Sequence, residues 1–507
     1  MNHSEILHNP GVSRMKSILP GVVVAVLAAA VIGLGPVWLI SDGSLKTVAA
    51  ITMLVVPLCL VLAVAKARAL DAARTTFLLG LLVWWFLLIS DKLFDRISEV
   101  ANTYEGQFSV DAYGEVFVWV VSLLVLALIS LSKPEYLGKM FTGSFKWFSL
   151  FVLSCVVAST YSPSPSYSLG WSFKLVVTAL VLGLCTSCME KMSDVTAMLW
   201  STMWALLFVC VLAVAEAAAD PLTMFQGVGG RLNADPVVLS GSAGCLVIIT
   251  LILNALHPRV WIKLIAAVGF MIMIVSFGKS GILATVIAAT VFLLFRKNLA
   301  SSVGLLGGMG VLAAILMTTV SPVAKYFTGY QGGSTLTGRT EIWQMGLDVI
   351  RRHPWFGNGY LSAKFMWTME RGPLADVGHL HNGFLEALYN NGVVGLIFLI
   401  GIHAAILANL FYAKKTVRTY QKAGGSDQAN TLIVGCFALY LDLFIYGLVT
   451  PAFGGRPTVH FMVFLSILGL SMALRKFAQQ VEEQPAKPVR TVALWQERFP
   501  APSPGSI

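Results

Sequence analysis

The sequence predicts an all-α, polytopic membrane protein with about twelve to fourteen spanning helices and one long external loop. Hydrophobic residues make up 57% of its 507 residues and charged residues only 12%, whereas soluble domains carry roughly 25% charged residues. The hydrophobic residues gather in runs of about 18 or more, and about 20 helical residues cross the hydrocarbon core of a bilayer. These runs are far too long for barrel strands, and only helices and closed barrels satisfy their backbone in lipid.

Fourteen segments are candidates for spanning helices. The weakest are 46–65, which contains Pro57, and the short segments 146–160 and 280–295, so twelve or thirteen spans also fit the pattern. The predicted spans are 18–40, 46–65, 75–90, 113–132, 146–160, 171–189, 195–218, 236–256, 260–277, 280–295, 299–320, 384–413, 430–450 and 458–474.

The distribution of lysine and arginine predicts the orientation. With residues 1–17 in the cytoplasm, the cytoplasmic segments collect 22 of these residues and the short external loops only 6. Cytoplasmic loops of membrane proteins carry such an excess, so both termini are predicted to be cytoplasmic. Residues 477–507, rich in proline and mixed charge, read as a disordered tail. The net charge of +10 therefore reflects topology, and binding to nucleic acid is not needed to explain it.

The external loop, residues 321–383, carries two polar signatures. The first is the run from Thr337 to Trp343, Thr-Gly-Arg-Thr-Glu-Ile-Trp. It leads into an amphipathic segment, Glu341 to Arg351, that predicts a helix ending before His353-Pro354. The second is His381-Asn382, which is followed after nine residues by Gly392-Val-Val-Gly395 as an apolar span begins.

Four basic or titratable groups are predicted on this external side. They come from widely separated segments, and such convergence is how a site is assembled between helices. Each also has a simpler explanation. Arg231 can bind lipid headgroups, Lys279 can be an ordinary loop cation, Arg339 can pair with Glu341 or cap a helix, and His381 can simply begin one.

The His-Asn motif, its distant Gly-x-x-Gly and the preceding polar runs resemble the signature of the O-antigen ligase and polysaccharide polymerase superfamily of bacterial envelope proteins. Two further stretches agree with that family, Ser162-Pro-Ser-Pro165 and the run from Arg352 to Tyr360. The resemblance covers about residues 160–395 and does not select a branch of the superfamily. It implies a scaffold of the membrane glycosyltransferase (GT-C) class in the bacterial inner membrane, with its site facing the periplasm.

The resemblance also implies a reaction. A saccharide is transferred from undecaprenyl diphosphate to an acceptor sugar hydroxyl, with inversion and without a metal or nucleotide cofactor. The expected partners are the lipid-linked glycan, an acceptor glycan or lipid A-core, the bilayer and other membrane proteins of polysaccharide assembly. We expect a polymerase of exopolysaccharide or O-antigen repeat units, and the alternative is a ligase that transfers the finished glycan to lipid A-core.

Residue chemistry suggests the roles within such a site. Cations near a low-dielectric surface stabilise the charge that develops on a leaving diphosphate, so we assign Arg339 and Lys279 to it, with Arg231 as a third cation. Family ligases usually have arginine where this chain has Lys279, and lysine keeps the charge but loses the bidentate fork. His381 is the candidate general base, because nearby cations lower an imidazole pKa and keep it neutral. The supporting residues are Asn382 as a helix cap, Gly392 and Gly395 for close helix packing, Trp343 and Tyr360 for stacking on sugars, and Glu341.

Two other functions fit parts of the pattern. His379 and His381 have the spacing of metal ligands, but all seven cysteines fall in or beside apolar segments and no clear carboxylate pair lies nearby. A lipid-linked glycan flippase or transporter would place ionisable groups near the middle of the membrane. Most charges here lie at the ends of spans, with Asp442 as an exception to which the sequence gives no role.

Overall fold

The computed structural model describes residues 72–93, 119–120, 142–218, 236–276, 278–296, 304, 339–365, 378–422 and 427–482. All regular elements within these ranges are helices. Six of them are long and apolar enough to cross a membrane: α8 (Pro165–Cys188), α9 (Met192–Ala218), α10 (Pro236–Leu256), α17 (Gly383–Lys422), α18 (Gln428–Gly447) and α19 (Val459–Glu482). Four further apolar helices accompany them: α3 (Ala72–Leu93), α7 (Lys146–Ser159), α11 (Val260–Ser276) and α12 (Lys279–Phe295).

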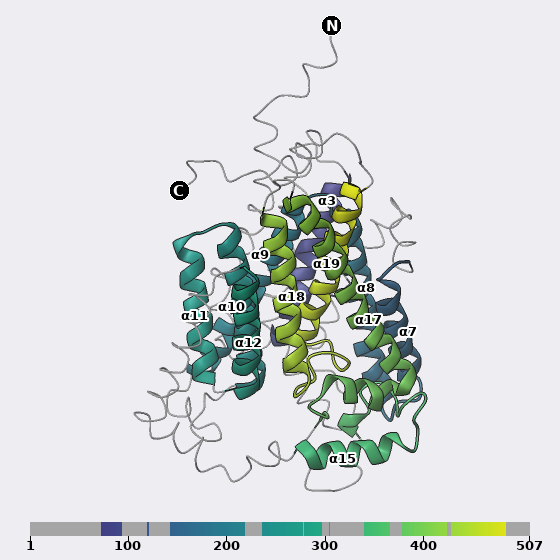
Figure 1. Ribbon diagram of the computed structural model, residues 1–507. Coiled ribbons are helices and arrows are strands. Elements are labelled where there is room, and N and C mark those ends of the chain that lie inside the picture. Colours follow the sequence, from purple (N-terminus) through teal and green to yellow (C-terminus); the bar gives the residue numbers. More distant parts are fainter. Residues whose placement is uncertain are drawn as a thin grey trace.

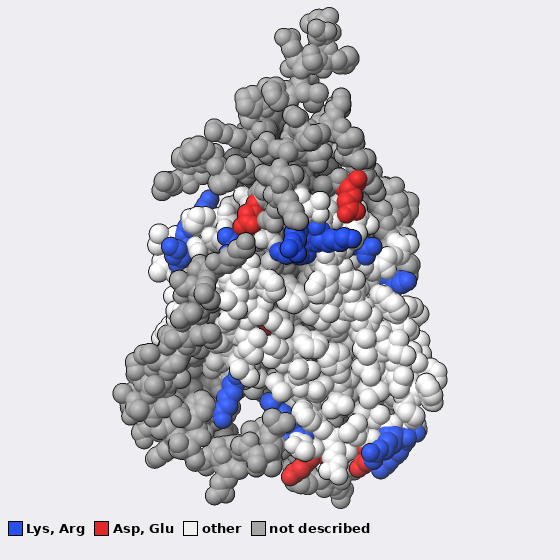
Figure 2. Space-filling model, in the orientation of Figure 1, with Lys and Arg blue, Asp and Glu red and all other residues white. Residues whose placement is uncertain are grey.

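Charged side chains confirm the membrane character of the bundle. Figure 2 shows the described lysine, arginine, aspartate and glutamate side chains gathered near the two ends of the bundle, with an almost uncharged belt between them. A belt of this kind is what the hydrocarbon region requires, because a charged side chain at its centre costs several kcal/mol, about 2.5 or more. The protein is therefore a multi-pass membrane protein.

The long helices stand side by side in one bundle (Figure 1). Helices α10, α11 and α12 pack together on one side, α7, α8 and α17 lie on the other, and α18 packs against both α12 and α17. The short helix α15 (Arg339–Ile350) lies across one end of the bundle. At that same end α7 meets α8, α11 meets α12 and α18 meets α19. We call the layer of loops at this end the external layer, after the side of the membrane that the sequence predicts for it.

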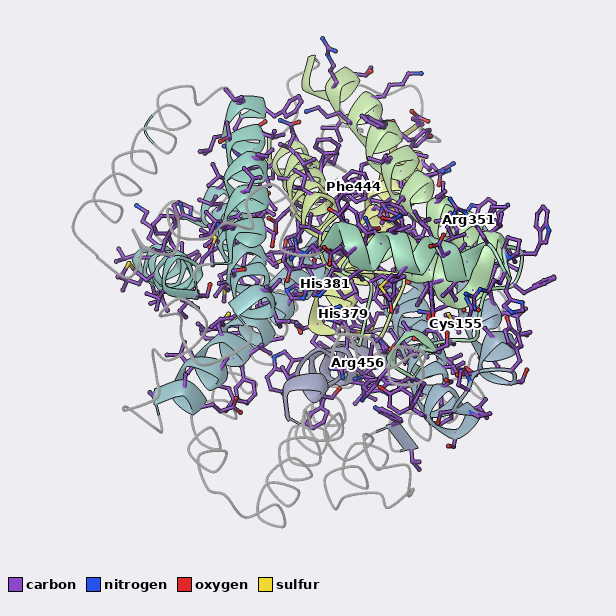
Figure 3. The ribbon with its side chains drawn as sticks, turned by 90° about the horizontal axis from the view of Figure 1, so that it is seen from below. Cys155, Arg351, His379, His381, Phe444 and Arg456 are labelled. Carbon is purple, nitrogen blue, oxygen red and sulfur yellow. The ribbon has the colours of Figure 1, made fainter. Side chains whose placement is uncertain are left out.

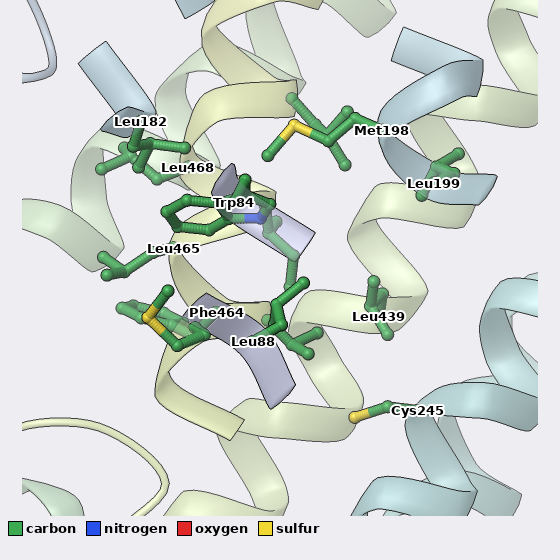
Figure 4. Close-up of a cluster of buried hydrophobic side chains, with 14 of the residues drawn as sticks. Trp84, Leu88, Leu182, Met198, Leu199, Cys245, Leu439, Phe464, Leu465 and Leu468 are labelled. Atoms are coloured by element: carbon green, nitrogen blue, oxygen red, sulfur yellow. The ribbon is translucent and has the colours of Figure 1, made fainter. Parts of the chain in front are cut away.

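Helix α3 occupies the centre of the apolar core. Trp84 of α3 is fully buried, and its indole nitrogen donates a hydrogen bond to Ser466 Oγ of α19 at 3.0 Å. Leucine, methionine and phenylalanine side chains of α8, α9 and α19 surround it (Figure 4). At the end opposite α15, Arg74 of α3 forms an ion pair with the buried Asp194 of α9. This core fixes the bundle that carries the external layer.

Asp442, to which the sequence gives no role, joins helices α10, α12 and α18. Its two carboxylate oxygens accept hydrogen bonds from Thr285 Oγ1 of α12 at 3.0 Å and from Cys245 Sγ of α10 at 3.4 Å. Buried polar groups without partners are costly in an apolar medium, so these bonds explain how α18 accommodates a carboxyl group there. The six described cysteines, Cys245 among them, are buried and free.

The predicted spans agree with the described helices to within three residues at each end, with three larger differences. Helix α8 begins at Pro165 rather than at residue 171, and proline is favoured in the first turn of a helix. Helix α17 continues to Lys422 instead of ending at residue 413. Helix α19 continues to Glu482, with Phe477 and Ala478 buried, so a tail beginning at residue 477 was wrong by six residues. Four predicted spans lie outside the described residues, wholly or almost wholly: 18–40, 46–65, 113–132 and 299–320.

Candidate functional site

Asn382 fixes the external end of α17. Its side-chain oxygen accepts hydrogen bonds from the backbone N–H groups of Phe384 at 2.9 Å and Leu385 at 3.0 Å. This is the N-cap that the sequence predicted, and it satisfies two of the backbone donors that a helix start leaves open. The side-chain nitrogen donates to the carbonyl oxygen of Leu448 at 2.9 Å. The cap therefore also ties the start of α17 to the end of α18.

His381 precedes this cap in a strained conformation. Its φ angle is +50°, in the left-handed region that residues other than glycine seldom adopt. The imidazole packs edge-to-face against that of His379, with 4.1 Å between ring centroids (Figure 3). Strain of this kind costs about 1–3 kcal/mol and concentrates at functional sites. The strained backbone at His381 thus directs its imidazole to a position that an unstrained backbone would not give it.

The surroundings of His381 keep its imidazole neutral. Burial, the neighbouring His379 and the Arg339 guanidinium together lower the pKa of His381 to about 3, in that order of importance. An imidazole with so low a pKa carries no charge at neutral pH and presents one unprotonated ring nitrogen. The direction of the shift agrees with the prediction, but burial rather than a neighbouring cation is its largest cause, and Arg339 is the last of the three.

Helix α15 brings Arg339 to this histidine. Trp343 Nε1 donates to the carbonyl oxygen of Leu380 at 2.8 Å, across 37 residues of sequence. The N–H group of Leu380 donates in turn to Glu386 Oε2 at 2.9 Å. A small apolar cluster beneath α15 completes the docking: Ile342, Val349, Ile350, Ala363, Leu380 and Tyr389. The half-buried Trp343 is thus a structural tie between α15 and the His381 segment.

Gly392 interrupts α17, and the backbone of an external loop fills the interruption. Its φ and ψ angles of +66° and −164° are not helical. The loop supplies four backbone hydrogen bonds there: Asn358 N to Tyr389 O at 2.9 Å, Gly359 N to Asn390 O at 3.1 Å, Val393 N to Pro354 O at 2.8 Å and Val394 N to Trp355 O at 3.2 Å. We expected Gly392 to allow close helix packing. The structure shows instead a break that accepts a loop, because a Cβ atom at Gly392 would overlap the backbone of Trp355 and Phe356.

Tyr360 anchors the same loop in the bundle. The residue is fully buried, and its hydroxyl donates to the carbonyl oxygen of Gly455 at 3.1 Å. Its carbonyl oxygen accepts a hydrogen bond from Ser168 Oγ at 2.6 Å. The expectation that Tyr360 stacks on a sugar was therefore wrong, since both faces of its ring are covered by protein.

The other predicted residues fall at different places in the external layer. Lys279 is exposed and is the first residue of α12. Glu341 is exposed in the first turn of α15, where a carboxylate is favourable to the helix dipole. A Cβ atom at Gly395 would overlap the side chain of Asn391 in its own helix, and Arg231 lies outside the described residues.

A second cationic group was missed in the sequence. Arg456, between α18 and α19, lies over the indole of Trp171 at 4.8 Å from the ring centroid. Lys364, in the short helical segment 363–365 after α15, lies over the ring of Tyr167 at 5.3 Å. Each is a single charge among uncharged neighbours in the sequence, so no local pattern distinguished it. Only the fold brings the two together.

Metal ligands are not grouped in the part of the chain that the structure describes. Within those ranges no three histidine, cysteine, aspartate or glutamate residues lie close enough to hold an ion together. His379 and His381 form a pair, and the nearby Asp376 lies outside the described residues.

Comparison with known proteins identifies relatives of one part of the chain. Residues 264–400 match the model of a family described as O-antigen ligase. This segment includes Lys279, Arg339, His381 and the break at Gly392. A protein of Rhizobium meliloti (strain 1021) named exopolysaccharide production protein ExoQ is 34% identical over 113 residues. The matched region is 20% of this chain and 25% of that protein. Both matches support an O-antigen ligase-like family.

Proposed function

We propose that this O-antigen ligase-like membrane protein transfers a saccharide from an undecaprenyl-diphosphate carrier to an acceptor sugar hydroxyl at its external, periplasmic end. One observation carries the proposal. A neutral imidazole, His381, is held in a strained backbone conformation beside the guanidinium of Arg339. Such a pair combines a proton acceptor with a cation for an anionic leaving group.

The reaction uses the two groups together. The acceptor hydroxyl oxygen attacks the anomeric carbon while the bond from that carbon to the diphosphate oxygen breaks. The bonding electron pair leaves with the diphosphate, whose negative charge increases, and the hydroxyl proton passes to the unprotonated nitrogen of His381. A single displacement of this kind inverts the anomeric configuration. Arg339 forms charge-assisted hydrogen bonds to the departing diphosphate, with Lys279 and Arg231 as further cations of the same external layer.

Donor binding makes His381 a stronger base. With a pKa of about 3, the imidazole of the free protein accepts a proton poorly, because basicity falls with pKa. A diphosphate bound at Arg339 offsets the last of the three causes of this shift, the Arg339 charge, and adds negative charge nearby, so both effects raise the pKa of His381. Burial, the largest cause, remains, so donor binding restores part of the basicity of the imidazole.

The test is transfer by the purified protein in lipid nanodiscs, supplied with a lipid-diphosphate-linked saccharide. His381→Ala and Arg339→Ala are expected to abolish transfer, while Arg351→Ala keeps it. Arg351 is a suitable control because it is an exposed external cation that pairs with Asp348 at 2.7 Å and lies at the other end of α15 from His381 (Figure 3). Normal transfer by either site variant, at matched protein level, would remove that residue from the mechanism. Movement of the glycan across liposomes without transfer would identify a flippase instead.

Among transferases we favour a polymerase of exopolysaccharide or O-antigen units. The name of the Rhizobium meliloti relative, an exopolysaccharide production protein, supports this choice, and the family description supports the alternative, an O-antigen ligase acting on lipid A-core. Deletion of the gene followed by glycan analysis separates them. A polymerase mutant accumulates single repeat units on the lipid carrier, whereas a ligase mutant accumulates long polymer there.

A further inference from the structure

Glu386 is a buried carboxyl group that the proposed reaction does not use. It belongs to the first turn of α17 and is only 2% exposed. Its Oε2 atom accepts the backbone N–H group of Leu380 at 2.9 Å, and its Oε1 atom lies 3.5 Å from Asn390 Nδ2. A carboxylate in the first turn interacts favourably with the helix dipole, but an exposed side chain would do so without the cost of burial. The helix dipole alone therefore does not explain a buried glutamate here.

The bond from Leu380 to Glu386 is one of three restraints on the residue before His381. The carbonyl oxygen of Leu380 accepts a hydrogen bond from Trp343 Nε1 at 2.8 Å. Its side chain is fully buried in the apolar cluster beneath α15. On the other side of the histidine, Asn382 caps α17. His381 thus lies between two residues that the fold holds in place.

These restraints maintain the strained backbone of His381. A φ of +50° is a conformation that an unrestrained residue other than glycine would leave. Because Leu380 precedes the histidine and Glu386 follows it, the bond between them closes a short ring of chain that contains His381. A hydrogen bond to a carboxylate is roughly twice as strong as one between neutral groups. A glutamate therefore closes this ring more firmly than an uncharged side chain would.

The carboxyl group of Glu386 is itself held by an external loop. A Cβ atom at Gly455, between α18 and α19, would lie 3.0 Å from Glu386 Cγ, so the two residues are in close contact. The carbonyl oxygen of Gly455 accepts the hydroxyl of the buried Tyr360 at 3.1 Å. Tyr360 follows directly after the loop that bonds to α17 at its break. A continuous set of contacts thus leads from the break, through Glu386, to His381.

We infer that Glu386 is a positioning residue that holds His381 in its strained conformation for proton transfer. The inference rests on the proposed function, because it names a residue that prepares the proton acceptor of the same reaction. Glu386 acts through the N–H group of Leu380 rather than on the substrate. A base that is already in place need not be ordered during the reaction. Loss of this restraint therefore lowers kcat and leaves the KM of the donor unchanged.

Transfer kinetics in lipid nanodiscs compare two substitutions of Glu386. Glu386→Leu removes the acceptor of the Leu380 bond, and kcat should fall about tenfold to a hundredfold, the range for a hydrogen bond to a charged group. Glu386→Gln keeps an acceptor oxygen of about half that strength, so its kcat should fall less than about tenfold. Asp442→Leu is the matched control. It removes another carboxyl group that is 2% exposed, and it should lower stability without changing kcat of the folded protein.

NMR titration of the His381 imidazole separates positioning from a purely structural role. Burial, His379 and Arg339 lower the pKa of His381 to about 3. A histidine released from the strained conformation becomes more exposed, so its pKa should rise toward the ordinary value in Glu386→Leu, and by less in Glu386→Gln. Asp442→Leu should leave this pKa unchanged. The His381→Ala variant identifies the signal.

The outcomes separate this inference from the proposed function. Wild-type kcat and wild-type pKa of His381 in both Glu386 variants would overturn the positioning role and leave the transferase intact. A raised KM with an unchanged kcat would assign Glu386 to donor binding and also overturn it. A raised pKa of His381 in a protein that transfers no sugar would support the restraint on His381 and contradict the proposed function. If Glu386→Leu fails to fold, Glu386→Gln decides alone, because wild-type values in that variant would overturn a role for the carboxylate.

Discussion

Substitution of Gly392 by alanine tests how the external layer is attached to the bundle. The φ and ψ angles of +66° and −164° lie in a region almost restricted to glycine, and forcing another residue into it costs about 1–3 kcal/mol. The new Cβ atom would also overlap the backbone of Trp355 and Phe356. Because those atoms belong to peptide groups rather than flexible side chains, the strain cannot be relieved by a change of rotamer.

The variant can avoid this strain if the loop from Pro354 to Gly359 detaches from α17. Four backbone hydrogen bonds would then be lost, each contributing about 0.5–1.5 kcal/mol. The four bonds together contribute about 2–6 kcal/mol. Because the protein adopts the cheaper of the two arrangements, this sum is the upper limit for the loss of unfolding free energy in Gly392→Ala. Transfer activity should fall as well, because the displaced loop also carries Tyr360.

The assay is the thermal unfolding of purified protein in detergent, read by size-exclusion chromatography of a fluorescent fusion. Gly143→Ala is the matched control. Gly143 also has a positive φ, +57°, but a Cβ atom there would have no neighbour within 4 Å among the described residues, so it isolates the backbone term of about 1–2 kcal/mol. Equal melting temperatures for the two variants would refute the conclusion that the loop from Pro354 to Gly359 must fit against the break at Gly392.

Three further predictions follow from the described contacts. Asn382→Ala should cost about 0.5–2 kcal/mol of stability through loss of the helix cap, and Asn382→Asp, which keeps the capping oxygen, should cost less in the same melting assay. For His381, kcat/KM plotted against pH should show no acid limb from this residue above about pH 5, since its pKa is lowered to about 3. Arg339→Gln removes one cause of that shift, so the pKa of His381, read by NMR titration of its imidazole, should be higher in this variant than in the wild-type protein. An unchanged pKa would show that the two residues do not interact. Asp442→Asn should keep the bond from Thr285 and melt near the wild-type temperature, whereas Asp442→Leu leaves buried donors without an acceptor and should cost about 1–3 kcal/mol.

Local signals in the sequence were sufficient for much of the fold. Hydropathy predicted both ends of α10, residues 236 and 256. The helix begins at Pro236 and ends where a polar turn follows Leu256, so the apolar segment and the helix have the same limits. Helix α17 continues past its predicted end because the part beyond residue 413 is polar, and hydropathy detects the membrane-spanning part of a helix rather than the whole helix. The cap at Asn382 was predicted because it depends only on the two or three residues that follow.

The parts of the site that depend on distant residues were not predictable. The apolar run through Gly392 reads as one continuous helix, and the loop that fills the break lies more than thirty residues earlier in the chain. In the sequence, Tyr360 is indistinguishable from an aromatic residue at the membrane interface. Only the fold shows its hydrogen bonds to Gly455 and Ser168. Arg456 and Lys364 are isolated charges in sequence, and they become a pair only on the ring faces of α8.

The break at Gly392 also implies an order of assembly. Hydrophobic segments enter the bilayer individually and pack afterwards, so α17 crosses the membrane before the loop from Pro354 to Gly359 can bond to it. The external layer is thus the last part of this region to form, and local units of a protein open with free energies below that of global unfolding. A variant damaged in this layer, such as Gly392→Ala, is expected to insert into the membrane and still lack transfer. Normal expression therefore says little about whether His381 and Arg339 are in place, and hydrogen exchange at Val393 and Val394 would report it directly.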